Sequence, residues 1–245
     1  MLTKWKAKEK IDTLRWFDIL ILTFILWGIA IKDSTLGYLG LLSQSITAEQ
    51  AVTFGTSENY QILAKQFILF AVAIFYLVIR KFNFRKLNIH FSIKAVVMGS
   101  LIFLGAAITQ DIYYKIVDPL ANFLPFPQMI GTFFNNETIS LLIYSLFNGM
   151  YEEIYFLGFC FAVSPKYFKY VIPFSILIRI SFHTYQGMAS AIGIGTIFGL
   201  YMLFVRYKSK DKNLFPFFIG HAWADIFGLS LIPVINYYYK FFSGY

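Results

Sequence analysis

The sequence YEEIYFLG, residues Tyr151 to Gly158, lies inside an otherwise apolar run from Thr138 to Val163. An acidic side chain at the centre of a bilayer costs about 3 kcal/mol, and this run contains two of them, Glu152 and Glu153. Ionisable residues at such depth normally face a water-filled cavity or a partner inside the helix bundle. The two glutamates are therefore predicted to be functional, with the rest of the chain arranged around them.

The composition predicts an all-α, polytopic transmembrane helix bundle. The chain has 245 residues, of which 58% are hydrophobic and 14% are charged, whereas about a quarter of the residues in a soluble domain are charged. This length suits a single membrane-embedded domain over residues 1–245. The only cysteine, Cys160, lies within the apolar run, which excludes an internal disulfide framework.

Seven apolar runs are long enough to be spans, at about residues 16–31, 60–79, 93–112, 138–163, 170–185, 188–205 and 214–237. The first is expected to be retained in the membrane, because Asp18 interrupts it and no small-residue cleavage site follows, as a signal peptide would require. Residues 33–59 and 117–136 are expected to be outer loops, and a re-entrant segment in either would add half-crossings. The GTIFG sequence at residues 195–199 has the small-xxx-small spacing that lets helices approach closely.

Basic residues predict the orientation of these spans. Of the 21 Lys and Arg residues, 16 fall in the connections before the first span and after the second, fourth and sixth. The positive-inside rule then places the N-terminus in the cytoplasm and the C-terminus outside. The net charge of +8 is explained by these flanking clusters, so no nucleic-acid partner is expected.

Four of the expected spans carry ionisable groups at membrane depth. These are Lys65 in the second, Glu152 and Glu153 in the fourth, Arg179 and His183 in the fifth, and His221 and Asp225 in the seventh. Residues four apart share a helix face, so Arg179 lies on the same face as His183, and His221 on the same face as Asp225. His90, in a basic connection, is expected to be structural.

Carboxylates combined with two imidazoles favour hydrolysis. Repulsion between two close, buried carboxylates would tune one of them toward a general base for water. Glu152, His183 and His221 could hold a divalent metal such as zinc, with one position open for water. The same groups could also act without a metal, by hydrogen bonding to water and to the oxyanion. A structural Glu153–Arg179 lock and the proton relay of a proton-coupled transporter remain alternatives.

Three motifs in order resemble the CPBP family of CAAX prenyl endoproteases and bacteriocin-processing proteases, also called Abi. Its signature is EExxxR, then FxxxH, then HxxxN or HxxxD, all in membrane helices. Here the first motif begins at Glu152, the second ends at His183, and HAWAD occupies residues 221–225. The resemblance covers about residues 137–230, which are the expected catalytic core.

The resemblance implies a role for each matching residue. Glu152 matches the glutamate that activates water, and Glu153 matches its supporting partner. His183 and His221 match the two essential histidines, while Asp225 matches the residue that helps to polarise the scissile carbonyl. The family is described both as metalloproteases and as metal-free glutamate peptidases.

Two positions depart from the family pattern. The arginine of the first motif is replaced by Leu157, and the phenylalanine of the second motif is replaced by Arg179. Because the missing arginine appears one motif later, we hypothesise that Arg179 takes over its bracing of the glutamates.

The sequence therefore predicts an intramembrane endopeptidase. Its expected substrate is a membrane-associated peptide or protein precursor, such as a signalling peptide or a bacteriocin leader. The bias toward Lys, Phe, Ile and Tyr suggests a bacterial plasma membrane as the location. A non-catalytic relative, acting as an immunity protein or a membrane regulator, is the main alternative because of Leu157. The sequence does not predict an oligomeric state.

Overall fold

The computed structural model describes residues 10–47, 55–121, 139–232 and 235. The α-helices of these residues are α1 (Trp16–Leu42), α3 (Thr56–Ile79), α4 (Ile93–Ala121), α5 (Ile139–Glu153), α6 (Phe168–Ser181), α7 (Met188–Ile192), α8 (Gly199–Lys208) and α9 (Phe215–Phe227). Two π-helical turns follow α5 and α7: η2 (Ile154–Phe159) and η5 (Gly193–Phe198). Short 3₁₀ turns are η1 (Phe84–Leu87), η3 (Pro165–Tyr167) and η4 (Thr184–Gln186). Over the described residues only two isolated β-bridges occur, which confirms the all-α class.

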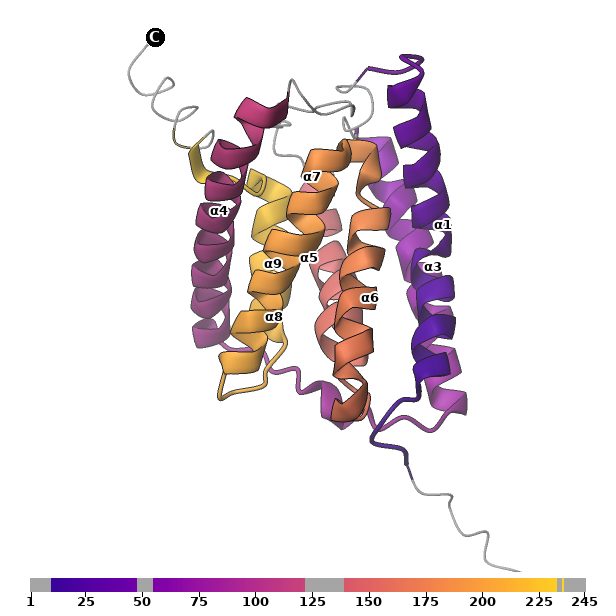
Figure 1. The fold of residues 1–245 in the computed structure, drawn as a ribbon. Helices are drawn as coiled ribbons and strands as arrows, with labels where there is room; N and C mark the ends of the chain where they lie inside the picture. Colours follow the sequence, from indigo (N-terminus) through magenta and orange to yellow (C-terminus); the bar gives the residue numbers. More distant parts are fainter. Residues whose placement is uncertain (1–9, 48–54, 122–138, 233–234, 236–245) are drawn as a thin grey trace, which may run out of the picture.

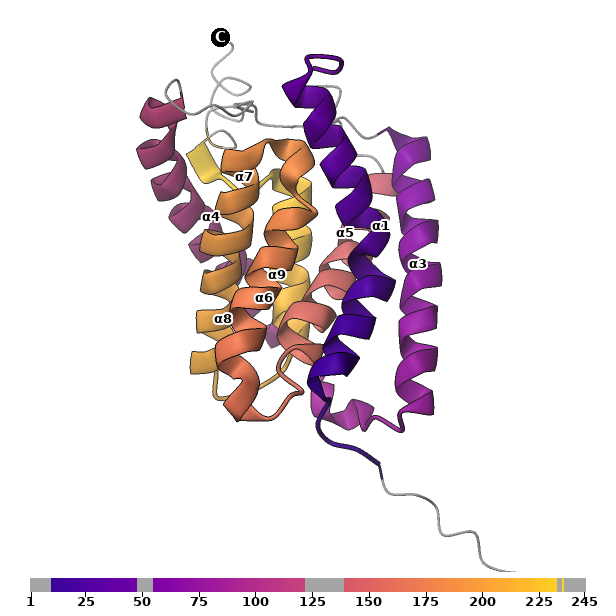
Figure 2. The same cartoon turned by 45° about the vertical axis from the view of Figure 1, so that its right-hand side comes forward.

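The helices stand side by side as a bundle, with α4 at one edge and α1 and α3 at the other (Figures 1 and 2). Helix α9 packs against both α4 and α5, and α5 also packs against α3. The helix formed by α7, η5 and α8 covers this group from the side, next to α6. The core of the bundle therefore lies around α5, η2 and α9, which carry most of the expected site residues.

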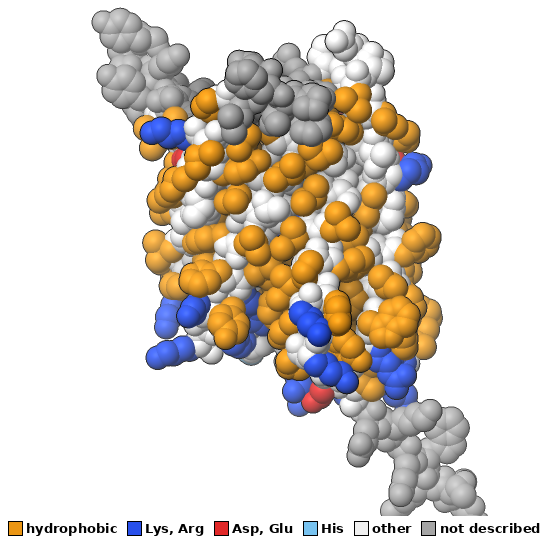
Figure 3. Space-filling model, viewed as in Figure 1, with side chains coloured by type: hydrophobic (Ala, Val, Ile, Leu, Met, Phe, Trp, Pro, Cys, Tyr) orange, Lys and Arg blue, Asp and Glu red, His pale blue; other side chains and the backbone are white. Residues whose placement is uncertain are grey.

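Four of the described helices are long and apolar enough to cross a membrane: Trp16–Leu42, Thr56–Ile79, Ile93–Pro119 and Met188–Lys208. Large hydrophobic side chains such as Phe24, Phe67 and Phe75 are exposed on the flank of the bundle. Lys and Arg side chains gather toward the lower end, where the flank gives way to the connections (Figure 3). An apolar flank and a basic end are typical of an integral membrane protein. Seven crossings and a cytoplasmic N-terminus stay predictions.

Several helix boundaries differ from the expected spans. Helix α1 continues to Leu42, so the first part of the expected 33–59 loop is helical. The fourth expected span changes from α-helix to π-helix directly after Glu153. Helix α9 ends at Phe227, because Gly228 adopts a positive φ of 76° that breaks the α-helical path. Much of the expected 117–136 loop, part of the 33–59 loop and the last residues of the seventh span lie outside the described residues.

The basic end is closed by the segment that precedes α1. The backbone N–H of Ile11 donates to Lys81 O at 3.0 Å, and that of Leu14 donates to Ala162 O at 2.7 Å. The exposed Asp12 carboxylate accepts a hydrogen bond from Asn83 and another from Lys86. These two bonds, the one from Asn83 most strongly, hold the pKa of Asp12 below its ordinary value. These contacts tie three chain segments together where the basic residues gather.

Candidate active site

A glycine brings the two helices of the site together. A Cβ atom at Gly149 of α5 would lie 2.5 Å from Phe218 O and 3.0 Å from Ala222 N of α9. Since real Cβ atoms do not approach backbone so closely, only glycine permits this contact. Gly149 lies one turn before Glu152 and Glu153, so the close approach sets the glutamates against His221.

Glu153 is held by two donors on one oxygen. Arg179 Nη2 donates to Glu153 Oε1 at 2.8 Å, and His221 Nδ1 lies 2.7 Å from the same oxygen. All three side chains are buried. Because the arginine keeps Glu153 ionised and an ionised carboxylate only accepts, His221 donates through Nδ1. Glu153 thereby fixes the orientation of the imidazole ring.

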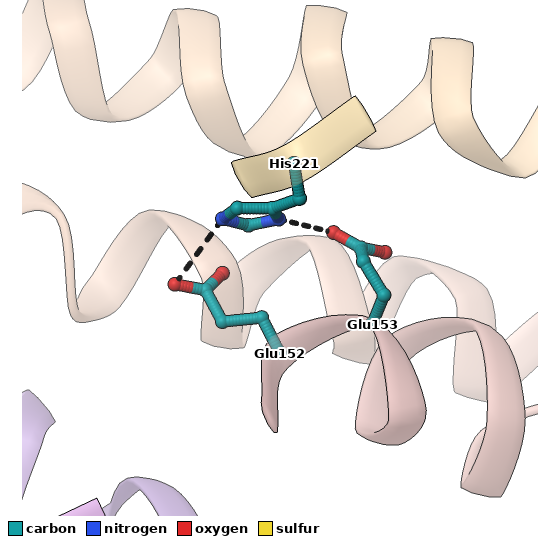
Figure 4. Close-up of side chains that lie close together, drawn as sticks. All are labelled: Glu152, Glu153 and His221. Carbon is teal, nitrogen blue, oxygen red and sulfur yellow. Dashed lines mark hydrogen bonds and ion pairs between the residues drawn. The ribbon is translucent and has the colours of Figure 1, made fainter. Parts of the chain in front are cut away.

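The other ring nitrogen of His221 faces the second glutamate (Figure 4). Its Nε2 lies 3.7 Å from Glu152 Oε1 and 3.6 Å from Asp225 Oδ1. These separations are too long for direct hydrogen bonds. They leave the Nε2 edge of the ring between two carboxylates, which is where a reacting group could be bound.

Asn148 and Gln66 complete the polar network, and the sequence analysis missed both. Asn148 Nδ2 donates to Glu152 Oε1 at 3.2 Å and to Asp225 Oδ2 at 2.9 Å. Gln66 Nε2 of α3 donates to Asn148 Oδ1 at 2.6 Å. The i, i+4 spacing of Asn148 and Glu152 was the available signal, because two polar residues on one face of an apolar helix share a cavity.

Several buried polar atoms of the site have no hydrogen-bond partner among the described residues. Within the described residues, Glu152 Oε2 and Glu153 Oε2 accept no hydrogen bond, and Arg179 Nε and Nη1 donate none. The Arg179 guanidinium instead lies over the rings of Phe156 and Phe198, 4.1 and 5.2 Å from their centroids. The aromatic faces stabilise the arginine through cation–π contacts, whereas Glu152 Oε2 is left available for chemistry.

His183 lies just beyond the C-terminal end of α6 and is buried. Its Nδ1 donates to Arg179 O at 2.7 Å, because the carbonyl oxygen can only accept. Lys65, in contrast, is exposed on α3, and His90 is exposed in the basic connection, so neither joins the site.

A protein-family model matches the segment that carries the site. Residues 134–227 match the family model described as Rce1-like, type II CAAX prenyl endopeptidase Rce1-like. The segment that carries the site is Rce1-like. This confirms the resemblance to the CAAX protease family that the three motifs predict. No curated protein and no solved structure matches the chain.

The Rce1-like segment also shows where the two departures from the motif pattern lie. Leu157 on η2 and Arg179 on α6 line one small cavity, together with Gly195 and Gly199. A Cβ atom at Gly195 would clash with Ile180, so the GTIFG sequence allows the close helix approach expected of it. Position 157 is therefore adjacent to the guanidinium that holds Glu153, as the exchange hypothesis requires.

The donor set also fits a divalent metal ion. Glu152, Glu153 and His221 offer ligand atoms within 4.8 Å of one another. Within this group, Glu152 Oε1 lies 3.7 Å from His221 Nε2, a separation that two ligands of one ion can have when each ligand bond is about 2.0–2.2 Å. The expected set of Glu152, His183 and His221 differs from this group, in which Glu153 is found and His183 is not.

Proposed function

We propose that this protein is an intramembrane endopeptidase that hydrolyses a peptide bond of a membrane-associated peptide or protein precursor. The observation that carries the proposal is the fixed His221 ring, whose Nε2 faces Glu152 and Asp225 while Glu153 holds Nδ1. A site of this kind inside an Rce1-like segment is suited to hydrolysis.

In the first step, Glu152 acts as the general base. Its free Oε2 takes a proton from water, and the water oxygen attacks the carbonyl carbon of the scissile bond. The carbon–oxygen bond forms while the carbonyl π electrons move to the oxygen, which becomes an oxyanion. Asn148 holds the other oxygen of Glu152, so the base keeps its orientation during the transfer.

In the second step, the tetrahedral intermediate collapses. His183 and His221 already donate through Nδ1, so each stabilises the oxyanion as an imidazolium that donates through Nε2, and Asp225 orients the group bound at His221 Nε2. The carbon–nitrogen bond then breaks, and Glu152 returns its proton to the leaving amine. The Glu153 carboxylate stabilises positive charge on His221, because the ring donates to it through Nδ1, and Arg179 holds that carboxylate in place.

A divalent metal held by Glu152 and His221 would polarise the carbonyl and lower the cost of deprotonating water. A chelator titration of active protein separates the two routes. Cleavage that is lost with chelator and restored by zinc indicates a metal enzyme, whereas unchanged cleavage indicates the metal-free glutamate route.

The proposed location is a bacterial plasma membrane, with several membrane crossings and a cytoplasmic N-terminus. The apolar flank and the basic lower end support a membrane location. The lipid bilayer is then the environment in which the substrate peptide meets the site.

The test is cleavage of a panel of membrane-associated peptides by purified protein in lipid nanodiscs. We expect wild type to cleave and Glu152→Ala and His221→Ala to be inactive. Glu58→Gln and His90→Ala are matched controls, because both side chains are exposed and far along the chain from the site. Variants that all cleave like wild type would contradict the proposal and favour a non-catalytic regulator.

A further inference from the structure

The side chains of the site become more exposed toward the C-terminal end of α9. The exposed fraction is 0% for Glu153, 5% for Glu152 and His221, and 22% for Asp225. Asp225 lies one helical turn beyond His221, which is about 6 Å farther from the start of α9. That start follows the basic connection at residues 206–212, so exposure increases away from the basic end.

The route from the basic end is sealed by apolar side chains. A Cβ atom at Gly158 of η2 would lie 3.0 Å from Leu87 and 3.3 Å from Leu214, so three chain segments meet there. Leu214 and Phe159 are completely buried. The backbone of this seal is also fixed, because Leu214 N donates to Asn88 O at 2.9 Å.

Polar side chains lie on the opposite side of the site. Tyr144, Asn148 and Glu152 follow one another at four-residue spacing and share one face of α5. Tyr144 is half-buried and lies two helical turns before Glu152 on α5. Half-buried Gln186 donates to the hydroxyl of Tyr185 at 2.8 Å. These hydroxyl and amide groups can bind the backbone of a peptide, which needs hydrogen-bond partners at membrane depth.

We propose that the substrate reaches Glu152 from the end of the bundle opposite the basic connections, past Asp225, Tyr144 and Gln186. This inference rests on the proposed peptidase function. Since the basic end is predicted to be cytoplasmic, the substrate class is an extended segment presented on the outer side of the membrane. Secreted peptide precursors and the outer ends of membrane helices have this form.

The test uses single-cysteine variants in a Cys160→Ala background, which removes the only native thiol. Gln186→Cys lies on the proposed route, and Ser164→Cys is its matched control because it is also half-buried but lies at the basic end. A bulky maleimide adduct at 186 should lower cleavage of the panel peptide at least tenfold. An adduct at 164 should leave cleavage within twofold. The reverse pattern would overturn the proposal.

Sidedness is measured without activity. In sealed cells, a membrane-impermeant thiol reagent should label Gln186→Cys and Tyr144→Cys, and should label Ser164→Cys only after permeabilisation. Labelling of Tyr144→Cys from the side of residue 164, or from neither side, would refute the route. Labelling of Gln186→Cys only in permeabilised cells would refute the outer-side assignment.

The two proposals fail in distinguishable ways. If no form of the protein cleaves but Tyr144→Cys is still labelled from outside, the peptidase and its peptide route are both refuted, and only a water path to the site remains. If unlabelled protein cleaves but the adduct at 186 has no effect, the peptidase stands and the route is wrong.

Discussion

Two arginine–carboxylate pairs in this bundle, each with a buried carboxylate, differ in how completely that carboxylate is satisfied. Asp18 of α1 binds Arg80 through both oxygens, at 2.7 and 3.1 Å, and also accepts from Tyr76 and from the backbone of Arg15. Glu153 receives both of its donors on Oε1, and its Oε2 accepts none within the described residues. The first carboxylate has no remaining acceptor to offer, whereas the second is part of an incomplete network.

The difference is the one we expect between a purely structural pair and a pair that serves the proposed active site. Burying a polar atom without a partner costs about 1–3 kcal/mol, so a fold that only needed a lock would satisfy every atom. The Asp18 cluster does this where α1 meets α3. The Glu152–Glu153 site leaves acceptors free, and a substrate or an ion can use them. Substitutions in the two regions should therefore affect different measurements.

The largest effect is expected for Glu152→Gln. Removing the general base should lower the cleavage rate by about 10⁴-fold, while the apparent melting temperature changes little because the amide has nearly the same shape. Cleavage assays and thermal unfolding in detergent would check both. Near-normal cleavage by this variant would show that the free oxygen of Glu152 is not catalytic.

The next effect tests whether Arg179 replaces the motif arginine. Arg179→Phe should lower cleavage about 100-fold, as loss of a supporting partner commonly does, since Glu153 then lacks its cation. The double variant Leu157→Arg with Arg179→Phe should cleave at least tenfold faster than Arg179→Phe alone, because position 157 lines the same cavity as Arg179. No recovery in a folded double variant would refute the exchange, and unfolding can be monitored by size-exclusion chromatography.

Asp18→Asn should change stability instead of catalysis. It leaves half-buried Arg80 without its charged partner and removes charge-assisted hydrogen bonds, so the free energy of unfolding should fall by about 1.5–3 kcal/mol. Cleavage per folded molecule should stay within about twofold. Asp12→Asn is the matched control, since Asp12 pairs with Lys86 in solvent and should have little effect. Loss of activity in folded Asp18→Asn would mean that this pair also serves the site.

The smallest effect is expected for Asn148→Ala. This change removes the amide that orients Glu152 and Asp225, so the cleavage rate should fall about tenfold with little change in KM. Asn59→Ala is the matched control, because Asn59 is also buried but donates to Ser140 instead of the site. Equal losses in the two variants would show that Asn148 acts only through packing.

The sequence predicted much of the site because charge inside a membrane is costly. Glu152, Glu153, Arg179, His183 and His221 stand out against an apolar background, and each of them is buried in the structure. The expected contact between Glu153 and Arg179 is present at 2.8 Å. The roles of these residues in catalysis, and that of Asp225, stay predictions.

Local pattern also determined the fold class, because long apolar runs in this chain form helices. The family match confirms the resemblance that the three motifs predicted. Helix boundaries were less predictable. The ends of α1 and α9 depend on local backbone conformations at Gln44 and Gly228, both with positive φ, which hydropathy does not detect.

Only the tertiary structure decided which groups meet. The approach of α5 to α9 at Gly149 brought Glu153 to Nδ1 of His221 and turned Nε2 toward Glu152, and no spacing along the chain contains this information. Gln66 joined through a contact between α3 and α5, while His183 stayed outside the group that could hold a metal. The cost of burial is a property of each residue and can be read along the chain. The pairing that offsets this cost depends on how the helices pack.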